Sequence, residues 1–312
     1  MQVIYSVDDF PSDVETAVTI GTFDGVHTGH RKIFEELIKT AKESNLKSVV
    51  FTFEPHPRKV LTNNKSSLDL ITITEEKIKL FKLMSLDFLV IQKFSKSFSK
   101  IDPLDFIRDF IVDKLNLKYL IVGYDHQFGK NRNGTFDSLQ QYSQLLGFSL
   151  KKIDVYKNSK IVVSSTKIRS LISSGMIEMA NRLLGYRYFF SGIVTKGNEI
   201  GKELGFATAN LQISEEKVHV QDGVYAVHAY VKNVRHSAMM NVGYNPTFEN
   251  DIFGEKKFEV HIFNFKENIY GEIIKIEVLK KIRNEVKFES KDKLIDQLNI
   301  DKQASLSIIQ EL

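Results

Sequence analysis

Gly21-Thr22-Phe23-Asp24-Gly25-Val26-His27-Thr28-Gly29-His30 is the strongest structural signal in the chain. It follows the short apolar run 17–20 and precedes apolar residues at helical spacing, namely Ile33, Phe34, Leu37, Ile38 and Ala41. This order predicts a strand, a glycine-bearing turn and a helix, an arrangement in which the helix N-terminus offers backbone amides to a phosphate. His27 and His30 stand three residues apart, so both imidazoles can face the same anion.

Two histidines at this spacing also occur in metal sites and in ordinary helix caps. A zinc site needs further ligands, and the chain has no cysteine to supply one. The three glycines (21, 25 and 29) and Asp24 favour phosphate binding instead. The motif resembles the HxGH signature of the nucleotidyltransferase superfamily, whose members transfer a nucleoside monophosphate from ATP or CTP to an acceptor.

The composition is that of a globular protein without a strongly charged surface. Of the 312 residues, 42% are hydrophobic and 26% are charged, and the formal net charge is +4. We therefore expect small phosphorylated partners and no nucleic acid. The lack of cysteine excludes disulfides and thiolate metal sites and is compatible with a reducing cytosol. Without a recognisable signal peptide or an apolar run near the ~20 residues that span a bilayer, we expect a cytoplasmic protein with no membrane partner. The oligomeric state stays open.

The first part of the chain alternates short apolar runs with helical patterns. The apolar runs, which predict strands, lie at 17–20, 48–53, 87–91 and 119–123. The helical patterns lie at 30–43, 75–84, 103–115 and 136–146. Pro103 suits a first helical turn, with Asp102 as its cap. Apolar strands alternating with helices predict a parallel, Rossmann-like α/β sheet that is covered on both faces.

After about residue 186 the hydrophobic period changes to two. Candidate strands lie at 223–232, 237–242, 257–262 and 272–278. Successive strands with short turns predict an antiparallel sheet closed into a small barrel. The tail, residues 290–312, returns to helical spacing and is expected to cover the barrel. The chain is long enough for two domains, which we place at 1–185 and 186–312.

Three further segments fall where a parallel sheet gathers its ligand-binding loops, beyond the carboxyl ends of its strands. His56 follows the second strand in Phe53-Glu54-Pro55-His56-Pro57, although a histidine between prolines also suits a rigid turn. Asp125, after the fourth strand, suits a ribose hydroxyl, a magnesium ion or a turn cap. A predicted helix start offers hydroxyls, amides and a guanidinium to a phosphate, from Ser164, Ser165, Thr166 and Arg169.

The segment 192–211 predicts a second phosphate site. It is not a P-loop, because the spacing before Gly201-Lys202 is one residue short and Glu203 replaces the hydroxyl residue. Glycines at 197, 201 and 205 suggest a flap that can lie over phosphates. Thr208 and Asn210 stand two apart in a strand-like run, so their side chains share a face and offer oxygen ligands suited to magnesium. The alternative is a polar edge strand after a surface loop.

With these segments the chain resembles the bacterial bifunctional riboflavin kinase/FAD synthetase family over nearly its whole length. The matching elements are GTFDGVHTGH (21–30), FEPHP (53–57), VGYDHQFG (122–129), SSTKIR (164–169), LGFATANL (204–211), GVY (223–225), NVGYNPTF (241–248) and FEVHIFNF (258–265) with IYG (269–271). The resemblance implies FMN adenylyl transfer in the first half and riboflavin phosphorylation in the second, with riboflavin, FMN and ATP as substrates, FAD as product and Mg²⁺ as cofactor.

The resemblance also implies roles for individual residues. Glu259 is the base that activates the riboflavin hydroxyl, while Thr208 and Asn210 bind Mg-ATP beneath a flap that contains Gly197, Gly201 and Lys202. In the first half, the catalytic groups are His27, His30 and Arg169. The ATP-binding residues there are Gly21, Phe23, Asp24, Gly25, His27, His30, Ser164, Ser165, Thr166 and Arg169. The flavin and ribose side is expected to include His56, Asp125 and Phe128.

The chain departs from the family pattern in three places. Ala207 replaces the proline of its P-T-A-N motif, so we expect ATP affinity or flap order to suffer before activity is lost. Asn264 replaces an aspartate in the strand that carries the base, and His126 with Gln127 leaves the role of Asp125 open. The alternatives to a bifunctional enzyme are an FMN adenylyltransferase with an impaired kinase half, an adenylyltransferase for another acceptor, and a non-catalytic flavin- or RNA-binding protein.

Overall fold

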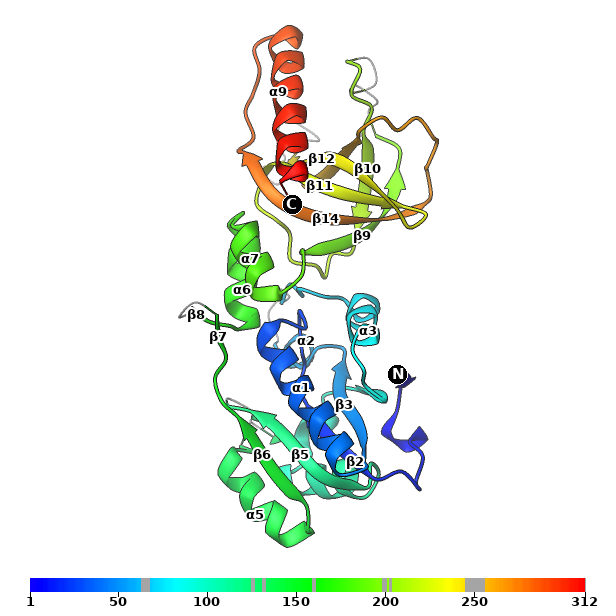
Figure 1. Ribbon diagram of the computed structural model, residues 1–312, viewed down its shortest axis with the longest axis vertical. Coiled ribbons are helices and arrows are strands. Elements are labelled where there is room, and N and C mark those ends of the chain that lie inside the picture. Colours follow the sequence, from blue (N-terminus) through cyan, green and yellow to red (C-terminus); the bar gives the residue numbers. More distant parts are fainter. Residues whose placement is uncertain are drawn as a thin grey trace. The chain divides into compact units, whose positions relative to one another are not determined.

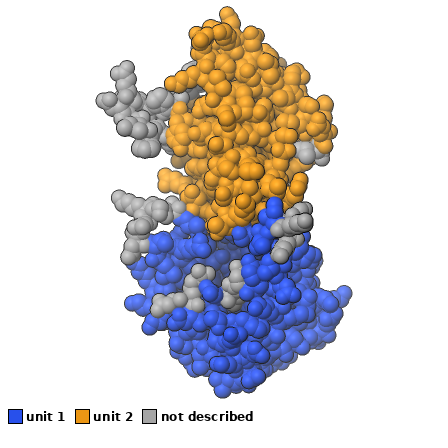
Figure 2. Space-filling view, turned by 90° about the vertical axis from the view of Figure 1, so that its left-hand side faces the viewer, with its two compact units in different colours: residues 1–68, 72–165 blue, residues 69–71, 166–312 orange. Residues whose placement is uncertain are grey.

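A computed structural model describes residues 1–62, 68–124, 127–130, 133–158, 161–197, 201, 204–244 and 256–311. The chain contacts divide it into two compact units, shown in different colours in Figure 2. The first, called here the sheet unit, contains Met1–Leu68 and Thr72–Ser165. The second, the barrel unit, contains Asp69–Ile71 and Thr166–Leu312. The domain boundary between residues 185 and 186 stays a prediction.

The sheet unit contains six parallel strands, which confirms the predicted fold class (Figure 1). In spatial order the strands are β1 (Gln2–Ile4), β4 (Phe88–Lys93), β3 (Lys47–Glu54), β2 (Thr16–Ile20), β5 (Leu117–Gly123) and β6 (Ser149–Ile153). From β2 the chain builds β3 and β4 on one side and β5 and β6 on the other. The carboxyl end of β2 is therefore the point where the strand order reverses, which is where ligands bind in open α/β sheets.

Helices accompany this sheet at the predicted places, and α2 is an additional helix that the sequence did not predict. They are α1 (Thr28–Glu43), α2 (Pro57–Leu61), α3 (Thr74–Lys82), α4 (Pro103–Asp105) and α5 (Phe136–Leu146), with short 3₁₀ turns η1 (Val7–Asp9) and η2 (Phe98–Lys100). Phe34, Leu37 and Ala41 are buried in α1, which packs against β2, β3 and β5. The strands β1 and β6 were not predicted, because one has three residues and the other is mostly polar.

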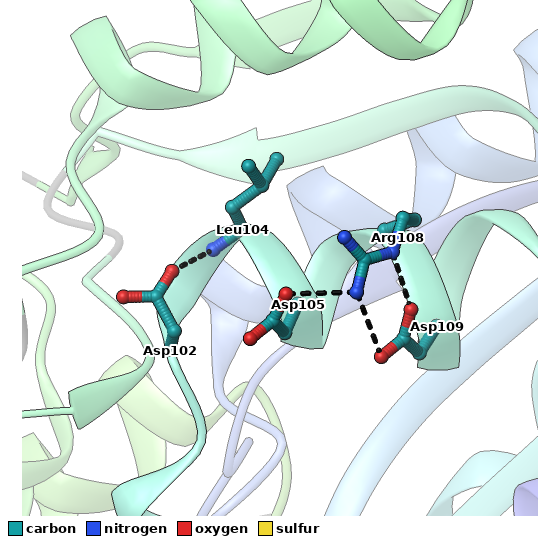
Figure 3. Close-up of polar contacts among 5 residues, drawn as sticks. All are labelled: Asp102, Leu104, Asp105, Arg108 and Asp109. Carbon is teal, nitrogen blue, oxygen red and sulfur yellow. Dashed lines mark hydrogen bonds and ion pairs between the residues drawn. The ribbon is translucent and has the colours of Figure 1, made fainter.

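The helix predicted at 103–115 is not a continuous α-helix. Asp102 caps α4 as expected, with its Oδ1 accepting the Leu104 N–H at 2.9 Å (Figure 3). The segment η3 (Phe106–Val112) then continues as a π-helix, whose wider turn buries Phe106, Ile107 and Ile111. The guanidinium of Arg108 contacts the carboxylates of Asp105 and Asp109 on the exposed side (Figure 3). Such exposed pairs contribute little to stability.

The barrel unit is a closed six-stranded barrel in which every neighbouring pair is antiparallel, as predicted. Its strands, in spatial order, are β10 (Ala209–Ile213), β13 (Lys256–Ile262), β12 (Val234–Tyr244), β11 (Gly223–Val231), β14 (Ile273–Arg283) and β9 (Phe189–Thr195). The predicted tail helix is α9 (Lys291–Gln310), and it packs against β11, β12 and β14 (Figure 1). It therefore covers the outside of the barrel.

An ion pair fixes α9 to the barrel. Arg283 of β14 donates from Nε and Nη2 to the fully buried carboxylate of Asp301, at 2.9 and 2.8 Å. Gln297 donates to the same carboxylate at 2.9 Å. The bidentate geometry satisfies a charge that would be costly to bury alone.

The remaining elements lie along the chain between β6, the last strand of the parallel sheet, and β9, the first strand of the barrel. They are β7 (Lys157–Asn158), β8 (Ile161–Val162), α6 (Ser165–Ser173) and α7 (Ile177–Leu184). Residues 69–71 also belong to the barrel unit, where Leu70 pairs with Lys217 and the Lys217 ammonium donates to the carbonyls of Ile71 and Phe189, at 2.5 and 2.9 Å. Within the described residues, no helix is both long and apolar enough to cross a membrane.

Candidate active sites

The turn after β2 has an unusual backbone. Phe23, Gly25 and Val26 all have positive φ angles, of 47°, 81° and 39°. Glycine adopts this region freely, but a β-branched valine does so at an energetic cost. Backbone strain of this kind is typical of functional sites. The ring of Phe23 packs back over Gly21, where a Cβ would lie 2.7 Å from it, so this glycine is required by packing.

Asp24 supports this turn from within. Its side chain is 1% exposed, and Oδ1 accepts the Thr72 N–H at 3.0 Å. The Thr72 hydroxyl accepts the Gly25 N–H at 3.0 Å, and the Asp24 carbonyl accepts the Ser165 hydroxyl at 2.9 Å. Sequence analysis missed Thr72, because nothing in its local pattern connects it with a turn 47 residues earlier. The described contacts of Asp24 thus hold the turn in shape.

His27 and His30 are brought together as the sequence predicted. His27 is the N-cap of α1, with its Nδ1 accepting the His30 N–H at 3.2 Å. The two rings stack, with centroids 3.5 Å apart and planes 17° apart. Because Nδ1 accepts, the neutral tautomer of His27 carries its proton on Nε2.

His30 is held as a neutral imidazole. Burial lowers its pKa well below the usual range for histidine, and repulsion from His27 and Lys77 lowers that pKa further. Its Nδ1 is buried and has no hydrogen-bond partner among the described residues. Since buried polar atoms are normally paired, this orphaned nitrogen is consistent with a ligand site.

Lys77 is a buried cation that sequence analysis missed. It lies on α3 and donates from Nζ to the Thr22 carbonyl at 3.0 Å. Burial lowers its pKa, while attraction by Asp24 and Glu54 acts in the opposite direction. The sequence signal was its spacing, because Lys77 shares the helix face of Leu80 and Phe81, three and four residues later. A lysine on an apolar face is uncommon unless it is paired.

The other predicted residues of the first site have mixed placements. His56 is 6% exposed and caps α2, with Nδ1 accepting the Arg58 N–H at 3.1 Å. Phe128 is 7% exposed and packs in the core of the sheet unit, beside Phe106. Ser164 belongs to the sheet unit, as does Ser165, whose hydroxyl contacts the turn. Thr166 and Arg169 lie on α6 in the barrel unit, so their role at the turn stays a prediction. Asp125 and His126 lie outside the described residues.

In the barrel, the strand pairing aligns residues that are distant in sequence. Asn210 of β10 is directly opposite Glu259 of β13, and Glu259 is directly opposite Asn241 of β12. On its other side Asn210 pairs with Thr195 of β9. The neighbours Phe258 and Val260 are buried inside the barrel, so Glu259 faces outward and is half-buried. This row therefore brings together the predicted base and a predicted metal ligand.

Two glycines of the predicted flap, Gly197 and Gly201, lie close to residues 206–210, which lead into this row. A side chain at Gly197 would overlap the amide group of Asn210. A Cβ at Gly201 would overlap the Phe206 carbonyl and lie 3.5 Å from the Thr208 hydroxyl. The Phe206 N–H donates to the Gly201 carbonyl at 2.7 Å and closes the turn. Gly197, Gly201, Thr208 and Asn210 are thus gathered in one region, while Lys202 lies outside the described residues.

An additional carboxylate lies beside this region. Glu285 follows β14, and its carboxylate lies against the backbone of Gly243, where any side chain would collide with it. Partial burial raises the pKa of Glu285, and repulsion from Asp222 and Glu259 acts in the same direction, while Arg283 and Lys256 oppose it. Sequence analysis did not select this residue, because it lies in a polar run after the last strand.

The oxygen groups of Thr208 and Asn210, beside a carboxylate, fit a magnesium ion that is also bound by a nucleotide. They do not form a cage of protein carboxylates and imidazoles. Among the described residues, no group of three or more histidine, cysteine, aspartate or glutamate side chains could hold a metal ion.

Comparisons with known proteins cover nearly the whole chain. A family model described as FAD synthetase matches residues 10–167, and one described as riboflavin kinase matches residues 184–309. A protein from Buchnera aphidicola subsp. Schizaphis graminum is 40% identical over 292 residues, covering 92% of this chain and 91% of its own. A Bacillus subtilis protein is 35% identical, covering 96% and 94%. Both are named bifunctional riboflavin kinase/FMN adenylyltransferase.

A crystal structure from Streptococcus pneumoniae has the same fold, with a TM-score of 0.88 and 31% identity, covering 97% of this chain and 98% of its own. It is described as a macrolide-efflux protein, an activity that neither family model nor either curated relative names. The curated relatives and the two family models agree with each other along the chain. The chain therefore belongs to the bifunctional riboflavin kinase/FMN adenylyltransferase family.

Proposed function

We propose that this bifunctional enzyme makes FAD from riboflavin at two separate sites. The barrel residues phosphorylate riboflavin to FMN, and the residues around the HxGH turn transfer AMP from ATP to FMN, with release of pyrophosphate. The observation that carries the proposal is that each family model covers its own cluster. The stacked His27 and His30 fall within 10–167, and the paired Asn210 and Glu259 fall within 184–309.

Adenylyl transfer needs no general base, because the FMN phosphate is already ionised near pH 7. A phosphate oxygen attacks the α-phosphorus of ATP in line, a new P–O bond forms, and the bond to the β-phosphate oxygen breaks. The imidazoles of His27 and His30 and the N-terminal amides of α1 stabilise the charge that develops on the transferring group and on pyrophosphate. Arg169 braces the polyphosphate, together with Ser164, Ser165 and Thr166.

The turn itself supplies the ATP contact surface of this site. Gly21, Phe23, Asp24 and Gly25 hold the backbone in the shape that lets the α1 amides approach a phosphate. His56, Asp125 and Phe128 belong to the flavin and ribose side of the proposal. The packing of Phe128 in the core supports an indirect role, in which it holds the loop rather than contacting the flavin.

Phosphorylation of riboflavin needs a base, because a primary alcohol is a poor nucleophile. Glu259 accepts the hydroxyl proton as the oxygen bonds to the γ-phosphorus and the bond to ADP breaks. Thr208 and Asn210 would hold Mg²⁺, which neutralises polyphosphate charge when it is bound. Gly197, Gly201 and Lys202 belong to the flap that covers the nucleotide. A cytoplasmic location completes the proposal and is supported by the lack of cysteine.

One experiment tests the pair of activities in the full chain. Riboflavin, ATP and Mg²⁺ are incubated with the enzyme, and flavins are separated by chromatography while pyrophosphate is measured. FMN should form first and FAD after it, with one pyrophosphate released per FAD. Formation of FAD from added FMN but never from riboflavin would leave only the adenylyltransferase. Indifference to both flavins would reject the proposal as a whole.

A further inference from the structure

His261 makes a contact that neither proposed mechanism uses. It lies on β13 two residues after Glu259, so the two side chains share the outer face of the barrel. Its Nδ1 lies 2.8 Å from the carbonyl oxygen of Ala207. Its ring centroid lies 5.1 Å from that of Phe206 and 5.6 Å from that of Phe263. A single histidine on the strand that carries the predicted base therefore contacts the predicted flap.

The direction of this hydrogen bond follows from its chemistry. A carbonyl oxygen only accepts, so the proton lies on Nδ1 of His261 and the bond is Nδ1–H···O=C. Burial lowers the pKa of His261, the bond to Ala207 opposes this, and the nearby ammonium of Lys302 on α9 lowers the pKa again. The neutral and the charged imidazole both donate from Nδ1. The contact is therefore available on either side of the histidine titration.

Ala207, whose carbonyl accepts this hydrogen bond, lies next to the residues predicted to bind Mg-ATP. Ala207 is exposed and immediately precedes Thr208, and Asn210 follows in β10. On the other side of Ala207, Phe206 packs with Met239 and Phe263, and this cluster is covered by three residues of α9, namely Leu298, Leu306 and Ile309. The backbone between a buried phenylalanine and the two polar ligands is thus held by the His261 bond. A proline at 207 would restrict the same backbone covalently.

We propose that His261 is a positioning residue for the kinase reaction, which fixes the Ala207 carbonyl and so holds Thr208 and Asn210 in the geometry that binds Mg-ATP. This side-chain hydrogen bond restrains the same backbone that a proline at 207 would restrict covalently. The proposal rests on the proposed kinase function of the barrel.

The test uses the full chain and compares three substitutions. His261→Phe keeps an aromatic ring against Phe206 but removes the donor. We expect it to raise the KM for ATP in riboflavin phosphorylation about five-fold, equivalent to about 1 kcal/mol, with kcat changed less than two-fold. His261→Asn keeps a donor near the position of Nδ1 and should restore most of the ATP affinity. Ala207→Pro in the His261→Phe background should also restore it, because proline stiffens the same segment.

Two controls separate positioning from a general loss of structure. His236→Phe makes the same chemical change on β12, where the ring packs edge-on against Phe265, and should leave the ATP KM unchanged. Adenylyl transfer, measured with FMN in the same samples, should be unaffected by His261→Phe. A structural defect would instead lower the melting temperature and kcat, and Ala207→Pro would not reverse it.

The outcomes distinguish the two proposals. If the unsubstituted chain makes no FMN from riboflavin, the kinase function itself is rejected. If it does, and His261→Phe leaves the ATP KM within two-fold of the unsubstituted value, only the positioning role is rejected. The same holds if Ala207→Pro and His261→Asn both fail to recover the affinity. The positioning role is supported if either substitution recovers the KM for ATP and His236→Phe leaves that KM unchanged.

Discussion

The two sites are built in opposite ways. In the sheet unit, the histidine pair and its turn come from ten consecutive residues at the end of one strand, and their contacts are largely buried. In the barrel unit, Asn210, Glu259 and Asn241 come from three strands and meet only because the barrel closes with a defined register. The first site is fixed by a local turn, and the second by the pairing of strands far apart in sequence.

This difference decides which substitutions are informative. A local, buried site depends on backbone conformation and on groups whose protonation is set by burial. A site on the outer face of a barrel depends on register and on the loop that closes over it. Each unit should therefore lose its own activity while the other is retained, because the two clusters share no described residue.

The largest expected effect tests the barrel side of the comparison. Glu259→Gln removes the proposed base but keeps the shape of the side chain. We expect kcat for FMN formation to fall by about 10²–10⁴-fold, the usual contribution of general-base catalysis. FAD formation from added FMN should be unchanged. Initial rates with each flavin measure both activities in one preparation.

The matched control for this substitution is Glu267→Gln, an exposed glutamate beyond the same strand. It should leave both activities within two-fold of the unsubstituted chain. Equal loss of both activities in Glu259→Gln would contradict the separation of the sites.

The second effect tests the sheet side. His30→Ala removes an imidazole that stacks on His27 and is proposed to face the polyphosphate. We expect FAD formation to fall by about 10²–10³-fold, as when one preorganised donor is removed from a charge-stabilising site. FMN formation should be retained. His30→Gln, which can keep a donor near Nε2, should lose less, and an equally large loss would argue against hydrogen bonding as its role.

The sequence predicted the local site better than the distributed one. The strand, turn and helix around Gly21–His30 follow from short-range signals, since apolar runs and glycines act within a few residues. The prediction of a helix at 103–115 was correct in the position of the helix and in its Asp102 cap. Its π-helical part was not foreseen, because the choice between turn types is made by the core that Phe106, Ile107 and Ile111 enter.

Features that combine residues far apart in the sequence could be recognised only in the folded structure. That Asn210 lies opposite Glu259 cannot be read from residues 49 positions apart, because register depends on the closure of the whole barrel. Thr72 and Glu285 have ordinary local patterns and gain their positions only through long-range packing. Lys77 was the exception, since a lysine on the buried face of a helix is visible in the sequence. The role of Glu259 came from family resemblance, and no spacing rule supplied it.

A third prediction sharpens the claim that burial controls the sheet site. The pKa of His30 is depressed in the folded chain, so below its ordinary value of about 6.5 the unfolded state binds a proton that the folded state does not. Stability is then fully present above pH 6.5 and falls as the pH falls. The loss is about 1.4 kcal/mol for each pH unit between 6.5 and the pKa of His30 in the folded chain.

Urea unfolding followed by circular dichroism at pH 7.5 and 5.5 measures this cost. His30→Gln cannot titrate in this range, so its loss of stability on acidification should be smaller than that of the unsubstituted chain. Equal losses in the two proteins would show that His30 is protonated in the folded state. The interpretation of His30 as a buried, neutral imidazole would then be wrong.

The smallest expected effect concerns Ala207, which stands where the P-T-A-N motif has a proline. Ala207 is exposed, and no hydrogen bond from its amide is seen among the described residues, so a proline there removes no donor that the fold uses. The carbonyl of residue 207 remains available to His261. Ala207→Pro should therefore raise the free energy of unfolding by about 0.4–1 kcal/mol, mainly by restricting the unfolded chain.

The same substitution should lower the KM for ATP in riboflavin phosphorylation, by about two-fold, because the ligand-bearing segment loses less freedom on binding. FAD formation from FMN supplies the internal control and should not change. A fall in melting temperature would mean that the backbone at 206–207 cannot accept proline, because the residue before a proline is confined to extended conformations. In that case Ala207 would be an adaptation of this flap to its own backbone path, and the barrel site would depend on loop conformation as closely as the sheet site depends on its turn.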